Sequence, residues 1–226
     1  WNDFAIIEAG ISQKDEMQSL AEIINPTHGL ITNIKEAHSS GFADNDEKLN
    51  EKLKLFKNCN TLFYCKDDLL VASKIEASFS DRELISWSTG KEGNLSLVAT
   101  EKKDGKTEVS AIYKEQGISI QIPFTDSASI ENVIHTWLIA LYFGLQLEEI
   151  QVRMSKLQSI DMRLNIIRGQ QGSTLISDYY NSDPSSVQIA LDTLEHQTSV
   201  GNKSIVLSTF EQINHSEDLY DSVFKT

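Results

Sequence analysis

The order of apolar and helical segments in residues 1–65 constrains the fold of this chain more than any other feature. Short apolar runs at residues 4–7, 29–34 and 61–65 alternate with helical patterns at 13–24 and 47–57. Strands that alternate with helices are typical of a parallel sheet with crossover helices. We therefore predict an α/β fold in which the three apolar runs are buried strands. The apolar faces of the two helices are formed by Met17, Leu20, Ala21 and Ile24 and by Leu49, Leu53 and Phe56.

The middle of the chain has a different pattern, in which short alternating segments are separated by glycines. These segments cover residues 84–89, 94–101, 106–114 and 117–123. Alternation of apolar and polar residues over such short lengths predicts antiparallel strands. We therefore expect an antiparallel addition to a mostly parallel sheet that is flanked by helices.

The remaining elements return to an α/β order. We expect two helices, two strands, a helix, a strand and a last helix. Their residues are 128–145, 147–157, 163–168, 173–177, 184–197, 203–208 and from about 216 onward. We place a domain boundary near residue 158, which gives one domain over 1–158 and the start of a second over 159–226.

Charge and composition exclude several functional classes. The chain carries 33 acidic and 20 basic residues, for a net charge of −13, whereas nucleic-acid binders and anionic-membrane binders need a basic face. Its most apolar run, residues 137–145, is far shorter than the roughly 20 residues of a membrane-spanning helix. Two cysteines exclude a disulfide framework and fit a reducing compartment, so we expect a cytoplasmic protein. The first residues have no Met and no basic leader, and we expect an internal fragment of a longer protein.

Two polar residues follow the expected strand ends. Glu8 comes after the run at 4–7, and His38 comes after the run at 29–34. The carboxyl ends of neighbouring parallel strands meet at one edge of a sheet, where ligands bind. A carboxylate suits Mg²⁺, and a neutral imidazole can ligate a metal. Taken singly, Glu8 is better explained by a helix-capping turn with an exposed acid, and His38 by a solvated loop.

Two further residues have both a functional and an ordinary explanation. Lys52 lies beside the apolar stripe of its helix. The ordinary explanation is a lysine that packs its aliphatic stem against the helix and keeps its amine in solvent. Asp178 follows the expected strand at 173–177, where it could accept hydrogen bonds from a ribose. In the ordinary explanation the same segment only caps the next helix, through Ser182 or Asp183.

The order of these segments resembles the motifs of the Mur ligase family. Residues 8–17 resemble E-x-G-x-S…G-E-M, and residues 32–38 resemble T-N-I-G-x-A-H. Residues 52–56 are similar to K-x-E-I-F, with the lysine at the family's spacing from the histidine. Three more segments match in order, namely residues 131–133 to G-x-H-N, 162–164 to G-R-L and 178–186 to D-x-Y-N-A-N-P-x-S. Together the six matches cover nearly the whole chain.

The resemblance implies a central ATPase domain followed by the start of a Rossmann-like C-terminal domain. It also implies an ATP-dependent amide ligase that works through an acyl phosphate. The motif at 178–186 is typical of the type that adds D-alanyl-D-alanine to UDP-N-acetylmuramoyl-tripeptide in peptidoglycan synthesis.

Carried over by motif, the resemblance implies two sets of site residues. Glu8, His38 and Lys52 would hold Mg²⁺, and Lys52 matches a lysine that is carbamylated in many family members. His38 and Lys52 would thereby serve catalysis. The second set would bind ATP, with Asn132 at the adenine and with the phosphate or ribose held by Arg163, Asp178 and Asn181.

The sequence also departs from the family pattern. No G-x-x-x-x-G-K-[ST] phosphate loop is present, so we expect that loop and the UDP-binding domain to lie outside this chain, which alone would have little or no activity. His135 and Asp183 stand where the family has asparagines, and residues 208–214 replace G-D-M-x-E-L-G. Such divergence resembles ligases fused to an alanine racemase. Two alternatives stay open, a non-catalytic scaffold with the same fold and a ligase similar to folylpolyglutamate synthetase.

Overall fold

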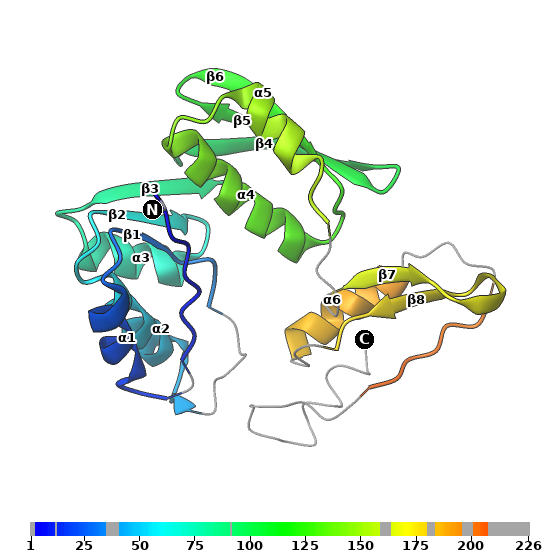
Figure 1. Cartoon of the computed structure of the whole chain (residues 1–226), viewed down its shortest axis with the longest axis horizontal. Coiled ribbons are helices and arrows are strands. Elements are labelled where there is room, and N and C mark those ends of the chain that lie inside the picture. Colours follow the sequence, from blue (N-terminus) through cyan, green and yellow to red (C-terminus); the bar gives the residue numbers. More distant parts are fainter. Residues whose placement is uncertain are drawn as a thin grey trace.

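The computed structural model describes residues 3–11, 13–34, 41–90, 92–158, 164–179, 184–195 and 201–207. Its largest element is a six-stranded sheet with the strand order β1 to β6 (Figure 1). The strands are β1 (His28–Leu30), β2 (Thr61–Cys65), β3 (Glu83–Ser88), β4 (Leu95–Lys103), β5 (Lys106–Tyr113) and β6 (Gln116–Ile122). The pairings from β1 to β4 are parallel, and those from β4 to β6 are antiparallel. The expected α/β sheet with an antiparallel addition is confirmed.

Helices cover both faces of this sheet. They are α1 (Glu16–Ile24), α2 (Asn45–Leu53) with a 3-10 turn (Lys54–Phe56), α3 (Leu69–Ser78), α4 (Ser127–Tyr142) and α5 (Leu147–Met154). Strand β2 is buried along its whole length, and its side chains alternate between two cores. Phe63 packs with α4 and α5, whereas Leu62 packs with α2 and α3. Such a strand needs apolar residues on both faces, which explains its uninterrupted apolar sequence.

The expected strand at residues 4–7 is wrong. This segment has no regular secondary structure, and its apolar side chains are exposed, with Phe4 at 72% and Ile6 fully accessible. An apolar run becomes a strand only where a neighbour pairs with its backbone. In the described residues the sheet begins instead at β1, which pairs with β2 alone. Glu8 therefore follows an extended segment rather than a strand end.

The expected antiparallel direction of β3 is also wrong. β3 runs parallel to both β2 and β4. Helix α3 forms the crossover that makes β2 and β3 parallel. Helix α3 is not predicted from the sequence. Its apolar pattern is weakly one-sided, although Asp68 caps its first turn by accepting a hydrogen bond from the Val71 amide (3.1 Å). The meander is therefore limited to β4, β5 and β6.

A smaller unit follows the six-stranded sheet (Figure 1). It contains an antiparallel pair, β7 (Asn165–Arg168) and β8 (Thr174–Ser177), and helix α6 (Pro184–Glu195). The expected strand at 203–208 is wrong for its described part, because residues 203–207 have no regular structure and Val206 is fully exposed. The expected helix from residue 216 lies outside the described residues. The domain boundary near 158 stays a prediction.

The structure also bears on the predicted absence of a membrane-spanning helix and of a disulfide framework. None of the helices in the described ranges is long and apolar enough to cross a membrane. Cys59 and Cys65 are both buried and free. Cys59 donates its thiol to the Pro26 carbonyl (3.3 Å), which makes it part of the packing between α1 and the 3-10 turn.

Candidate functional site

Lys52 lies in the last turn of α2, at a position that the apolar face of this helix determines. Asp44 caps the helix by accepting a hydrogen bond from the Glu47 amide (2.8 Å). Leu49 and Leu53 are buried beneath the helix, so Lys52 lies at the border of the buried face and is half-buried. Burial lowers the pKa of its ammonium, and the negative charge of Glu8 partly offsets this effect. The structure therefore brings Glu8 and Lys52 into electrostatic range.

The side chains of Glu8 and Lys52 fit Mg²⁺ only if the Lys52 amine is converted to an anion. The Glu8 carboxylate is exposed and is the kind of oxygen ligand that Mg²⁺ prefers. The Lys52 ammonium would repel a cation, whereas a carbamate on the same nitrogen would attract it. Among the described residues no group of three His, Cys, Asp or Glu side chains could hold a metal ion. His38, the third predicted ligand, lies outside the described residues, and the metal site stays a prediction.

The amino-terminal half of helix α4 contacts the carboxyl end of β3 and the segment that follows β1. Asp126 caps its first turn by accepting a hydrogen bond from the Ser129 amide (2.7 Å). Near that end, the Asn33 side-chain amide donates to the Glu131 carboxylate (3.2 Å). The amino-terminal half of α4 is thus tied to the segment that follows β1.

A second contact of α4 involves His135, which is 1% exposed. The Trp87 indole N–H, from the end of β3, donates to His135 Nδ1 (3.0 Å). The other ring nitrogen, Nε2, lies 3.1 Å from the Thr32 carbonyl oxygen. Burial lowers the pKa of His135 to about 4, so the ring is neutral near pH 7.

Asn132 lies between these two contacts. Its side chain is exposed, and it makes no hydrogen bond to another residue in the described part of the chain. An amide offers both a donor and an acceptor, which is what the edge of an adenine requires. The position is compatible with the predicted adenine contact, which stays a prediction.

Asp178 belongs to the smaller unit. It follows β8 and is partly buried, and its carboxylate accepts a hydrogen bond from the Leu164 amide (3.1 Å). Leu164 has a positive φ of 44°, a conformation that is uncommon for a branched side chain, and this hydrogen bond helps to hold it. Arg163 and Asn181, the other predicted contacts of the nucleotide, lie outside the described residues. Asp178 therefore has a structural role that the motif alone does not reveal.

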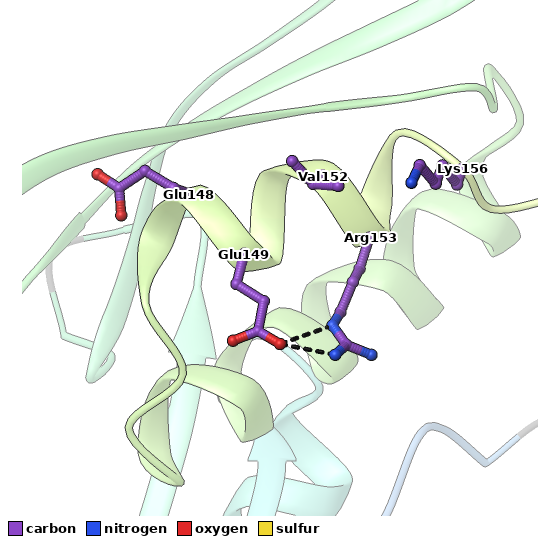
Figure 2. A pocket seen from close by; sticks show the side chains of 5 residues that line it. All are labelled: Glu148, Glu149, Val152, Arg153 and Lys156. Atoms are coloured by element: carbon purple, nitrogen blue, oxygen red, sulfur yellow. Dashed lines mark hydrogen bonds and ion pairs between the residues drawn. The ribbon is translucent and has the colours of Figure 1, made fainter.

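A surface hollow on α5 is a separate feature (Figure 2). In Figure 2 the Arg153 guanidinium and the Glu149 carboxylate point toward one another, and Nε and Nη2 donate to the same oxygen at 3.0 and 2.6 Å. Both side chains are exposed to solvent, so this is an ordinary i,i+4 helix pair. Within the described residues, no hydrogen bond or ion pair links the side chains of this hollow to those at the strand ends. Its lining is Glu148, Glu149, Val152, Arg153 and Lys156.

Sequence reasoning missed the residues that hold the strand ends and α4 together. In the sequence, Asn33 and Glu131 are only members of two motifs, and His135 is only a departure from the family pattern. Asn33 and Glu131 are 98 residues apart, and Thr32 and His135 are 103 residues apart. Hydrophobic periodicity carries no information about contacts over such distances. One signal in the sequence is the i,i+4 spacing of Glu131 and His135, which places both side chains on the same side of the helix.

Comparisons with a family profile, with curated proteins and with solved structures all point to the same family. Residues 1–140 match the sequence profile described as Mur ligase middle domain. The chain is 24% identical over 221 residues to UDP-N-acetylmuramoyl-tripeptide–D-alanyl-D-alanine ligase of Bacillus subtilis (strain 168), which covers 96% of this chain and 47% of that protein. The chain thus spans about half the length of the curated relatives that it matches.

Solved structures show the same fold. The MurF ligase of Thermotoga maritima in complex with ADP superposes with a TM-score of 0.76 at 16% identity, over 94% of this chain and 49% of that one. A crystal structure of MurF from Acinetobacter baumannii gives a TM-score of 0.73 at 22% identity, over 84% and 42% of the two chains.

Proposed function

This chain belongs to the Mur ligase family, and we propose that it is part of an ATP-dependent ligase that adds D-alanyl-D-alanine to UDP-N-acetylmuramoyl-tripeptide in peptidoglycan synthesis. The observation that carries the proposal is the similarity to relatives of that name over 96% of this chain. The juxtaposition of Glu8 and Lys52 supports it, because two distant motifs supply the same charged site.

The proposed reaction has two steps, a phosphoryl transfer and an amide-bond formation. The γ-phosphoryl group of ATP transfers to the carboxylate of the tripeptide, which gives an acyl phosphate and ADP. The amine of D-alanyl-D-alanine then attacks the acyl carbon, an amide bond forms, and phosphate leaves as the amine loses a proton. Both steps accumulate negative charge on oxygen atoms, and a bound Mg²⁺ would offset that charge.

The chain's own residues prepare this site. The lowered pKa of Lys52 favours the neutral amine, which is the form that attacks CO₂. That reaction forms an N–C bond, gives a carbamate anion and releases one proton. We propose that this carbamate, Glu8 and His38 hold Mg²⁺. We also propose that Asn132 contacts adenine, and that Arg163, Asp178 and Asn181 contact the phosphate or ribose.

The wider setting is part of the same proposal. We infer that the complete protein supplies a phosphate loop and a UDP-binding domain, acts in the cytoplasm, and binds small-molecule substrates rather than nucleic acid or a membrane surface. The excess of acidic residues supports this choice of partners. A fused alanine racemase in the parent chain stays a prediction of the same kind.

The test uses the complete protein that contains this chain. We expect ADP release to require UDP-N-acetylmuramoyl-tripeptide and D-alanyl-D-alanine together, with the pentapeptide product seen by mass spectrometry. Lys52→Ala should lower the rate by roughly a hundredfold or more, while the control Lys57→Ala, at an exposed lysine just after the 3-10 turn, should leave it unchanged.

Three outcomes would contradict the proposal. Stimulation by L-glutamate with a folate, and not by D-alanyl-D-alanine, would support the folylpolyglutamate synthetase alternative. Unchanged ligation in Glu8→Gln, His38→Ala and Lys52→Ala variants would support a non-catalytic scaffold. Full ligation by the 226-residue chain alone would show that no phosphate loop is required.

A further inference from the structure

His135 joins three elements that are far apart in the sequence. An indole nitrogen can only donate, so the Trp87 contact makes Nδ1 of His135 an acceptor. A neutral imidazole with an accepting Nδ1 carries its proton on Nε2. His135 Nε2–H therefore donates to the Thr32 carbonyl (3.1 Å). Through this ring α4 is bonded to the end of β3 and to the segment after β1, across β2, which lies between them in the sheet.

Glu131 provides a second bond to the same segment. It lies one helical turn before His135 and accepts a hydrogen bond from Asn33, the residue that follows Thr32. Two bonds from consecutive turns of one helix to consecutive residues of one segment restrict both sliding and rotation of α4. Asn132 follows Glu131 directly, and so it lies at the fixed end of the helix.

The hydrogen bond between Trp87 and His135 is buried, whereas the bond from His135 to the Thr32 carbonyl is part-buried. The ring is 1% exposed and Trp87 is 6% exposed. Removing one partner of a buried hydrogen bond leaves the other unsatisfied, which costs far more than losing a surface contact. The ring packs edge-on against the indole, with centroids 5.4 Å apart.

We propose that His135 is a positioning residue for nucleotide recognition, which holds α4 against the ends of β1 and β3 so that Asn132 meets the adenine edge. The inference rests on the proposed function for its ligand, an adenine nucleotide. It assigns a role to a residue that stands where the family pattern has an asparagine. The predicted consequence is a loss of base selectivity, which a general loss of packing would not produce.

The test compares three variants of the complete protein. His135→Phe keeps a ring but loses both hydrogen bonds, and His135→Gln keeps one donor and one acceptor. Trp137→Phe is the control, because Trp137 is fully buried on the same helix and its indole nitrogen has no hydrogen-bond partner among the described residues. Calorimetry measures binding of ADP and of IDP, which has an oxo group in place of the adenine amine. Amide hydrogen exchange measures the opening of residues 31–34.

We expect His135→Phe to reduce the preference for ADP over IDP by about tenfold, the effect of about one buried hydrogen bond. Exchange at residues 31–34 should be faster in the same variant. His135→Gln should restore much of both properties, and Trp137→Phe should leave both unchanged even if it lowers the melting temperature.

Two results would overturn the inference while leaving the proposed function intact. One is an unchanged ADP preference in His135→Phe, and the other is an equal loss in Trp137→Phe. Absence of any ADP binding by the unaltered protein would instead contradict the proposed function. In that case, faster exchange in His135→Phe but not in Trp137→Phe would still show that His135 restrains residues 31–34. Unchanged exchange in His135→Phe would contradict that restraint too.

Discussion

At the scale of single residues, burial decides the charge of the groups at the strand ends. His135 and Lys52 are both bases, and removal from water lowers the pKa of each. For His135 the result is a neutral ring with one donor and one acceptor in use. For Lys52 it is an amine that is more readily neutral, near the carboxylate of Glu8. The sequence shows which residue types are present, but their protonation depends on a fold that brings distant segments together.

The pKa of His135 predicts a pH dependence of stability. Its pKa falls from 6.5 to about 4 on folding, so the unfolded chain binds more protons between these values. The free energy of unfolding therefore decreases as the pH falls through this range. Between pH 7 and pH 5 the His135 contribution should amount to about 2 kcal/mol. Urea titrations should show that His135→Gln loses about that much less stability than the unaltered chain, and equal losses would refute the assignment.

At the scale of elements, β1 packs closely against the 3-10 turn that follows α2. Gly29 in β1 faces Phe56, and a Cβ at this position would lie 2.7 Å from Phe56 Cε1 and 2.8 Å from Leu62 Cδ2. Only glycine leaves room for the ring. This contact seats the turn after α2, and with it Lys52, against the strand that leads to Thr32.

A substitution at Gly29 tests this packing. We expect Gly29→Ala to lower the free energy of unfolding by about 1–3 kcal/mol, the usual cost of overpacking. Gly117→Ala in β6 is the matched control, because a Cβ there would meet nothing within 4 Å, and its change should stay within about 0.5 kcal/mol. Thermal or urea unfolding followed by circular dichroism would measure both. Equal effects of the two substitutions would show that β1 is not closely packed.

The same scale shows what the sequence could predict. We predict β2, α2 and α4 at nearly their observed residues, because β2 is an uninterrupted apolar run, the two helices have apolar faces, and all three pack into cores. Helix α3 was missed because its apolar residues are weakly one-sided, and the direction of β3 was then assigned wrongly. The apolar run at 4–7 was expected as a strand, although a strand also needs a partner that local sequence does not reveal.

At the scale of the whole molecule, the candidate site is built from segments that meet only in three dimensions. Motif order predicted that Glu8 and Lys52 belong to one site, and the structure brings them into electrostatic range although Glu8 does not follow a strand. The restraint on α4 could not be predicted, because Thr32 and His135 are 103 residues apart. The family match explains the fold of residues 1–140.

The most direct test of the central claim is a carbon-13 spectrum of the complete protein in labelled bicarbonate. The claim is that Lys52 becomes a carbamate which, with Glu8, holds a divalent cation. We predict one carbamate carbon resonance that disappears in Lys52→Arg, a variant that keeps the charge but lacks the nucleophilic amine, and that Mn²⁺ broadens. The absence of this resonance, together with full ligation activity in Lys52→Arg, would contradict the account.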